Sequence, residues 1–338
     1  MIDFRYHLVS LVSVFLALAV GVALGAGPLR EPISGALTDQ LQQLSADRSQ
    51  LRKDLGTAEG AVANRDVFLT DVAPALVADQ LGGRTVVLVT LPGIEGEAVA
   101  PLTRTLQTAG ARVVGRIDVQ ESWTDPGRQG ARQQVVDRLA SAVPSGTPRT
   151  PQGQGNAQVS ADAAPLAALL ARAVVTGELA QSGESDATGR RILEELSGAG
   201  LVDVDGDFAG RATEAVLLVP GVPQPAAGAT PTPTPSPDPA PVWTVLGTAL
   251  DAGSDGAVAV GPASSALAGG VIAAVRATQA AAVAVSTVDT GGTPMGDVTT
   301  VLALREQQLG GAGNYGFGAG AAAPLPPRTL PDPRTSPS

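Results

Sequence analysis

A stretch of mostly apolar residues lies near the start of the chain, at Leu8–Leu29, and contains no charged residue. As an α-helix rising 1.5 Å per residue, this run is ~33 Å long, enough to cross a hydrocarbon core of ~30 Å. We therefore predict a cytoplasmic tail at 1–7 and a single transmembrane anchor at 8–29. A cleaved secretory signal ending near Ala23-Leu24-Gly25 is the alternative, and the length of the run favours the anchor. Because a short N-terminal tail usually stays inside, we expect the large domain outside the cytoplasm, in the cell envelope.

Small residues recur every four positions along the predicted anchor and therefore share one helix face. They are Ser13, Ala17, Gly21 and Gly25. Small side chains let two helix backbones approach closely in lipid, so this face favours a dimer contact. Small residues are also common in membrane spans that do not pair, so the pattern alone leaves both interpretations open.

A second apolar pattern follows the anchor, at 33–70, where apolar positions are separated alternately by four and three residues. The seam consists of Leu37, Leu41, Leu44, Arg48, Leu51, Leu55, Ala58 and Val62. This spacing predicts a coiled-coil stalk that pairs as a parallel homodimer, in which Arg48 costs stability and fixes the register. The alternative is a single amphipathic helix that packs on its own domain, but so narrow a seam favours a partner helix.

From residue 82 the pattern changes to that of an α/β domain. Thr85–Leu91 is a β-branched run typical of a strand covered on both faces. The helix Gly96–Ala109 and the strand Arg112–Val119 complete a βαβ unit, which implies a parallel, Rossmann-like sheet. Further strands are expected at Leu201–Val204, Ala215–Val219, Ala257–Val260 and Ala282–Val288. Further helices are expected at Gln129–Ala142, Pro165–Val175, Thr188–Ser197, Val242–Leu250, Ser265–Arg276 and Gly296–Leu309.

Proline-rich and glycine-rich stretches divide this region. Pro144–Ser160 is predicted to be a flexible loop and 324–338 a disordered tail. The segment 220–241 contains PTPTPSPDPAP, which predicts a polyproline-like spacer. We interpret it as an insertion in one α/β domain formed by 82–219 and 242–318, because neither flank alone has enough strands for a covered sheet. A boundary between two domains is the alternative.

The composition excludes several classes of function. The 338 residues carry a net charge of −10 and no basic patch, which argues against nucleic-acid binding. The chain has no cysteine, and His7, at the membrane edge, is the only histidine. No Ser-His-Asp or Cys-His constellation can therefore form in the soluble part. We expect no catalytic residues, no enzyme activity and no cofactor.

Two loops were considered as binding loops. The turn Leu91–Gly96 after the first strand is neither GxGxxG nor a Walker loop, and its proline and glutamates disfavour phosphate. The glycine-rich run 310–318 follows a predicted helix, where glycine normally ends the helix, so a C-cap and loop are favoured over a binding loop. Its candidate functional residues are Gly313, Asn314, Tyr315 and Gly316.

Two long motifs carry a family resemblance. The opening IDFRYHLVSLVSVFLALAVGVALGAGPL and the later STVDTGGTPMGDVTTVLALREQQLGGAGNYG, Ser286–Gly316, closely resemble the two ends of the actinobacterial MctB family, described as copper transporters. The order of elements between them agrees, so the resemblance spans most of 1–318. It implies a role in copper transport or homeostasis in the cell envelope, with copper as the transported ion. Some relatives are linked instead to cell division and work with a membrane partner.

The candidate metal ligands are few. Soft copper sites use thiolate, thioether or imidazole ligands, and outside the termini and the anchor this chain offers only Met295. Where family members often have histidine in the terminal motif, this chain has Asn314. The metal ligands, if any, are therefore unknown. The alternative function is a non-catalytic coiled-coil scaffold that binds an envelope or cell-division partner.

Overall fold

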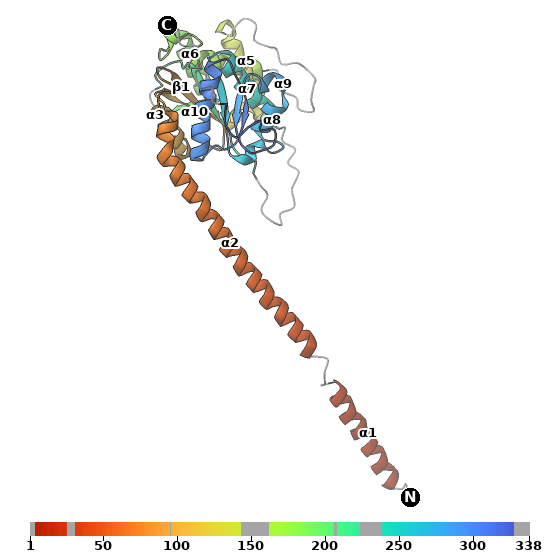
Figure 1. Cartoon of the computed structure of the whole chain (residues 1–338). Coiled ribbons are helices and arrows are strands. Elements are labelled where there is room, and N and C mark those ends of the chain that lie inside the picture. The colour runs from red at the N-terminus through yellow and green to blue at the C-terminus, as the bar shows by residue number, and fades with distance from the viewer. Residues whose placement is uncertain are drawn as a thin grey trace. The chain divides into compact units, whose positions relative to one another are not determined.

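The computed structural model describes residues 4–25, 31–94, 96–142, 162–205, 208–223 and 238–327 (Figure 1). The chain divides into two compact units, Met1–Arg65 and Asp66–Ser338. The expected loop Pro144–Ser160, most of the proline-rich segment 220–241 and most of the tail 324–338 lie outside the described residues.

The first unit begins with helix α1 (Phe4–Gly25), which is apolar along almost its whole length. The span Arg5–Gly25 has a mean hydropathy of 2.5, and none of it is buried against the described chain. By length and composition it is a candidate membrane span, a test that a signal sequence also passes.

Helix α2 (Glu31–Val77) follows and is 47 residues long. Every side chain from Asp39 to Arg65 is exposed. The last turns belong to the second unit, where Ala73 and Val77 are buried. Pro74 lies inside the helix and has no N–H to donate, but its carbonyl still accepts a bond from the Ala78 N–H.

The second unit is built on a seven-stranded sheet in the order β3-β2-β1-β4-β5-β6-β7. The strands are β1 (Thr85–Thr90), β2 (Arg112–Val119), β3 (Val202–Asp205), β4 (Glu214–Leu218), β5 (Ala257–Val260), β6 (Ser286–Val288) and β7 (Asn314–Tyr315). All neighbouring pairs are parallel except β2 and β3. The fold is therefore α/β with a mostly parallel sheet.

Helices cover both faces of this sheet (Figure 1). They are α3 (Ala100–Thr108), α4 (Gln129–Arg138), α5 (Ala163–Val174), α6 (Ala187–Gly198), α7 (Ala240–Ala252), α8 (Val271–Ala277), α9 (Gln279–Ala282) and α10 (Pro294–Gln308). On one face α5, α6, α7 and α8 enclose the larger apolar core, whereas the end of α2, α3 and α10 enclose the other. The central strands β1, β4 and β5 are buried throughout, which explains their continuous apolar sequences.

Strand β3 corrects the expectation of an all-parallel sheet. It lies where a strand was predicted, but it is antiparallel to β2. The Gln120 N–H donates to the Leu201 carbonyl, and the Ser122 hydroxyl donates to the Gly200 carbonyl. Helix α6 therefore delivers the chain to the carboxyl end of β2, and β3 can pair with β2 only by running back along it.

Several expected elements are shorter than predicted, among them one helix and one strand near the C-terminal end. The helix Ser265–Arg276 is broken into a 3-10 turn at Ala263–Ala266 and α8, because Gly269 has a φ of +82° that an α-helix does not allow. The strand Ala282–Val288 is confined to β6, since 279–282 form a helical turn.

Candidate functional site

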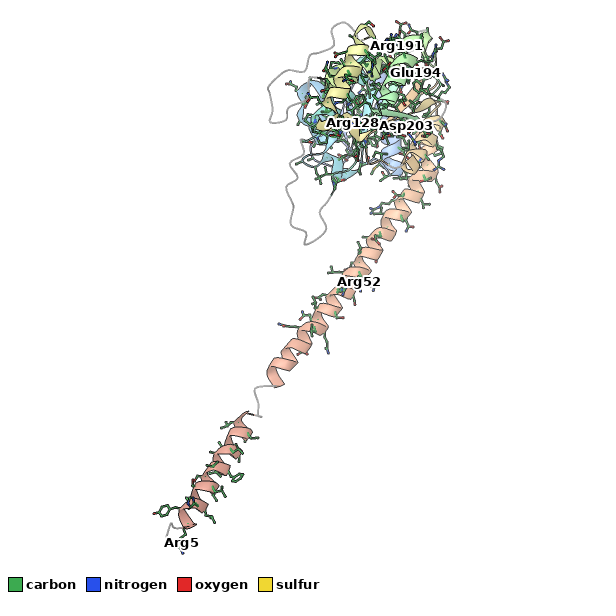
Figure 2. The ribbon with its side chains drawn as sticks, turned by 180° about the vertical axis from the view of Figure 1, so that it is seen from behind. Arg5, Arg52, Arg128, Arg191, Glu194 and Asp203 are labelled. Carbon is green, nitrogen blue, oxygen red and sulfur yellow. The ribbon has the colours of Figure 1, made fainter. Side chains whose placement is uncertain are left out.

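The predicted dimerisation residues lie on exposed helix faces, except Leu37, whose side chain is outside the described part of the chain. The small residues of α1 are exposed, and a Cβ built on Gly21 or Gly25 would meet no atom of the described chain. On α2 the seam residues are equally open, with Leu41 59% and Leu51 69% exposed. Figure 2 shows the α2 side chains, with Arg52 labelled. Ala73 and Val77, by contrast, lie in the core of the second unit.

The candidate loop at the C-terminal end is partly strand, which corrects the expectation of a C-cap followed by loop. Asn314 and Tyr315 form β7, parallel to β6. The Thr287 N–H donates to the Gly313 carbonyl over 2.9 Å, and the Asp289 N–H donates to the Tyr315 carbonyl over 3.1 Å. The structure therefore brings the glycine-rich run against the strand that begins the same motif.

A buried ion pair holds this segment in place. The Arg276 guanidinium lies 2.9 Å from Asp289 Oδ2, and their side chains are only 5% and 1% exposed. Arg276 also donates to the Thr287 hydroxyl and to the Tyr315 and Ala319 carbonyls. Asp289 accepts bonds from the N–H groups of Phe317 and Gly318, each over 2.9 Å. These contacts satisfy both buried charges and fix the backbone after β7.

The glycines of the motif are explained by lack of space. Gly316 has a φ of +123°, and a Cβ there would overlap the Asp289 carboxylate. A Cβ on Gly313 would overlap the Tyr315 hydroxyl, which donates to Glu306. The motif therefore encodes a structural anchor for the chain end, and it leaves Phe317 68% exposed.

Sequence reasoning missed Arg276 and Asp289 as key residues. Arg276 was only one residue of a predicted helix, and Asp289 was read only as part of the family motif. An aspartate directly after a buried strand was the one available signal, because such positions meet at the carboxyl edge of a parallel sheet.

The carboxyl edge between β1 and β4 is closed by the chain itself. In parallel sheets that reverse strand order, this is the place where nucleotides bind. Here the Leu91 N–H donates to the Leu218 carbonyl over 3.0 Å, which continues the β1–β4 pairing to the end of the strands. A Cβ on Gly93 would lie 3.6 Å from Pro220 Cβ, so the loops that follow the two strands are in contact.

A polar pocket of about 540 Å³ lies beside this closed point, at the ends of β1 and β2. Its lining includes Thr90, Asp118, Gln120 and Glu121. The Thr90 hydroxyl and the Arg116 guanidinium both donate to Asp118. The charge of Asp118 is thus already satisfied within the protein.

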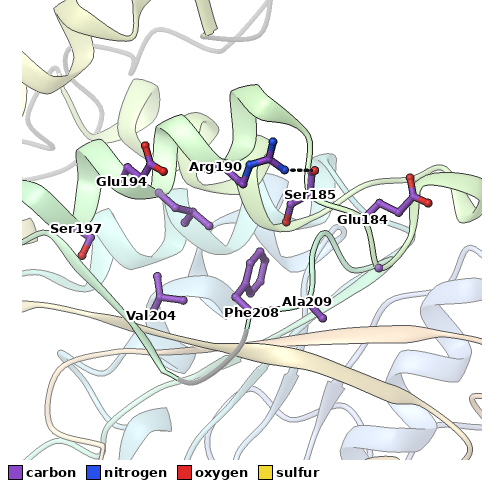
Figure 3. A pocket seen from close by; sticks show the side chains of 10 residues that line it. Glu184, Ser185, Arg190, Glu194, Ser197, Val204, Phe208 and Ala209 are labelled. Carbon is purple, nitrogen blue, oxygen red and sulfur yellow. Dashed lines mark hydrogen bonds between the residues drawn. The ribbon is translucent and has the colours of Figure 1, made fainter.

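A larger, open groove of about 890 Å³ lies between α6 and the edge strand β3 (Figure 3). Leu193, Val204 and Phe208 supply its apolar lining. Glu194 and Arg190 lie above them, and Arg190 donates to the Ser185 carbonyl over 2.8 Å. Cysteine, histidine and methionine line neither this groove nor the polar pocket.

Glu214 is a fully buried carboxylate at the start of β4. Burial raises its pKa to about 7, against the opposing effect of a 2.5 Å hydrogen bond from Gln308. Arg84, which is paired with Asp255 at 2.5 Å, also lowers this pKa, and Asp255 raises it. Sequence reasoning missed Glu214, since it precedes the predicted strand Ala215–Val219 and has no motif around it.

Within the described residues, no group of three or more histidine, cysteine, aspartate or glutamate side chains is arranged to hold a metal ion. Met295, the methionine of the second unit, is partly buried near the start of α10.

Comparison with known proteins gives one consistent result. Residues 1–326 match the family described as "Copper transport outer membrane protein, MctB". A protein named copper transporter MctB from Mycobacterium leprae is 27% identical over 328 residues, which are 96% of this chain and 98% of that protein. Its namesake from Mycobacterium tuberculosis strain H37Rv is 28% identical over 330 residues, 95% of this chain and 98% of that protein.

Proposed function

Since the chain belongs to the MctB family of copper transport proteins, we propose that it is a membrane-anchored component of copper transport or homeostasis in the cell envelope. The observation that carries this proposal is the extent of the match, which includes both the N-terminal span and the C-terminal motif. The alignment covers 98% of the length of each relative, so the similarity is not confined to one segment of those proteins.

The anchor is the uncleaved helix α1. Its 22 residues are long enough for a bilayer core of ~30 Å when the adjoining apolar residues are included. The second unit, Asp66–Ser338, then lies outside the cytoplasm. There it acts as a Rossmann-like, non-catalytic scaffold without a nucleotide. This is supported by the strand order, which is that of nucleotide-binding sheets, together with the close approach of the loops at Gly93 and Pro220.

Copper is the cargo in this proposal, and its ligands come mainly from outside this chain. The whole sequence contains no cysteine, one histidine and two methionines, so a site with several soft ligands cannot be assembled from one copy. Carboxylates are hard ligands that suit copper poorly, and the described residues contain no cluster of them. The chain therefore contributes to copper handling by positioning a partner.

The second candidate function is a scaffold for an envelope or cell-division partner with no link to copper. The observation that favours it is the scarcity of soft ligands in a chain that exposes, beyond the span α1, a row of large apolar side chains on α2. The two candidates share the anchor and differ in whether copper is involved.

A growth assay distinguishes these functions. A deletion strain is grown across a range of copper concentrations and complemented with the wild-type gene or with Met295→Leu. The copper proposal expects copper sensitivity that the wild type rescues, and rescue by Met295→Leu places the ligands in another protein. Normal copper tolerance with a defect in septation would overturn the copper proposal in favour of the scaffold.

Metal titration of the purified full-length protein in detergent adds a direct measurement. Because soft ligands are scarce, we expect no Cu(I) binding in competition with a chelator of micromolar affinity. Stoichiometric binding that Met295→Leu abolishes would show that the chain itself carries the metal.

A further inference from the structure

The apolar seam of α2 is a surface without a partner in the described chain. Between Asp39 and Arg65 every side chain of this helix is exposed. The seam side chains Leu41, Leu44, Leu51, Leu55 and Val62 are 51–69% exposed. An isolated helix gains nothing from such a row, because its stability in proteins comes mainly from packing one apolar face. We therefore expect these apolar side chains to pack against another protein surface, which we call the covering surface.

The spacing of the seam identifies the shape of that surface. Counting from Leu41, the separations run three, four, three, four, three and four up to Val62. This is the a and d pattern of a coiled coil, with Leu41, Arg48 and Leu55 at a positions and Leu44 and Leu51 at d positions. A globular domain would need a wider apolar stripe than two positions in seven.

We propose that the covering surface is the same helix of a second copy of this chain, in parallel and in register. The inference rests on the proposed membrane anchor for its direction. Two copies anchored in one membrane both start α2 near that membrane, because residues 26–30 reach no more than about 20 Å. An antiparallel pair with a full seam overlap would separate the two starts by about 50 Å, so only the parallel pair satisfies the tether.

Charges beside the seam both favour and oppose this pairing. In a parallel pair each g residue faces the e residue five positions later on the other helix, which places Asp47 opposite Arg52 twice, once on each side. Asp54 then faces Glu59, a like-charge pair that weakens the association. Arg48 faces its own copy at the seam, which costs stability and limits the strength of the pair. The result is a moderate dimer that the common tether strengthens.

The chain offers a clean test because it contains no cysteine. Full-length variants Leu44→Cys, Leu51→Cys and Lys53→Cys are expressed separately, oxidised in membranes and examined on non-reducing gels. In a parallel, in-register pair, d positions face their own copies at a distance that a disulfide spans. We expect dimer bands for Leu44→Cys and Leu51→Cys and none for Lys53→Cys, which lies on the outer face at an f position.

Other patterns overturn the proposal. In the antiparallel arrangement with full overlap, residue 44 faces residue 55 and residue 51 faces residue 48. Dimer bands that appear only when Leu44→Cys and Leu55→Cys proteins are mixed would therefore show the antiparallel pair. A monomer in all three single variants and in that mixture would show that the seam covers another protein or the chain's own domain. The membrane fraction is checked in each sample. A soluble product would refute the membrane anchor, whereas a membrane-bound monomer would refute only the pairing of the helices.

Discussion

Glu214 is the residue whose charge is most strongly altered by the fold. Its pKa is raised from 4.5 to about 7, chiefly because burial disfavours the ionised form. Between these two values the folded protein keeps a proton that the unfolded chain has released. The contribution of this group to the free energy of unfolding therefore decreases by about 3 kcal/mol as pH rises from about 4.5 to about 7. Above pH 7 the contribution stays constant.

We predict that Glu214→Gln removes most of this pH dependence. Glutamine resembles the protonated acid and keeps an oxygen for the Gln308 amide, so the variant should match the wild type near pH 4 and be more stable by about 3 kcal/mol at pH 8. Urea unfolding at several pH values measures this, with Glu194→Gln on the exposed face of α6 as the control. The variant retains the slope from Asp251 and Asp297, whose pKa values burial raises to about 6, so the comparison with the wild type isolates the part due to Glu214. Identical pH profiles for Glu214→Gln and the wild type would contradict the prediction.

Asp289 gives the second residue-level prediction. Asp289→Asn leaves the Arg276 charge buried without its counter-charge, and breaking such a pair typically costs about 3–5 kcal/mol. We expect a loss of this size in urea unfolding and faster proteolysis after Phe317. Glu195→Gln is the control, since it breaks the exposed pair with Arg138 and should cost less than about 1 kcal/mol. Equal losses in the two variants would show that the buried pair is not a special anchor.

These residues also mark the limit of what the sequence predicts. Thr85–Thr90 was recognisable as a buried strand because a continuous β-branched run is typical of a strand covered on both faces. The role of Asp289 could not be read in this way. Its partners Arg276, Phe317 and Gly318 meet it only after β6 and β7 have paired. Asn314 had been considered as a substitute for a histidine in a binding loop, and it lies instead in β7, where its side chain accepts from Thr287.

At the scale of elements, local patterns predicted the existence of strands and helices better than their direction or pairing. A four-residue strand such as β3 has the same sequence pattern in either direction. The short connection from α6 determines that β3 runs antiparallel to β2. Strand β7 has two residues within a glycine run and was predicted as loop. The helical period of α2 was predicted well, whereas its partner stays a prediction.

We predict that Arg48→Leu strengthens self-association of the full-length protein. In the proposed pair two guanidinium groups face each other within an apolar seam, so replacing them with leucine should lower the dissociation constant at least about tenfold. Sedimentation in detergent measures this. Lys53→Leu removes the same charge from the outer face of α2 and should change little. Conversely, Leu44→Asp with Leu51→Asp should abolish the dimer. Equal effects of Arg48→Leu and Lys53→Leu would contradict the seam.

At the scale of the whole molecule, membrane topology is the first prediction. The span Arg5–Gly25 has a mean hydropathy of 2.5, and a short tail precedes it. A reporter that is active only outside the cytoplasm, fused to the C-terminal end, should give signal. The product should also stay in the membrane after an alkaline wash. A shortened, soluble product would show that α1 is a cleaved signal.

The last prediction concerns the unity of the α/β domain. Strand β4 precedes the proline-rich segment and β5 follows it, yet the two are neighbours in the sheet, with Ala215 paired to Ala257. Helix α7 returns the chain to the sheet, and the Asp238 carboxylate accepts a bond from the Ala240 N–H at its start.

If the two flanks form one cooperative domain, replacing residues 224–236 with a Gly-Ser linker of about six residues should change stability little. Shortening a loop alters its closure entropy only slightly, and Asp238 is retained. We expect one thermal transition in both proteins, with similar midpoints. Unfolding is followed by circular dichroism and by tryptophan fluorescence. Trp123 and Trp243 precede and follow the replaced segment in the sequence, so each reports on one flank. Separate midpoints for Trp123→Phe and Trp243→Phe, which report on one tryptophan each, would show that the proline-rich segment divides two domains that unfold independently.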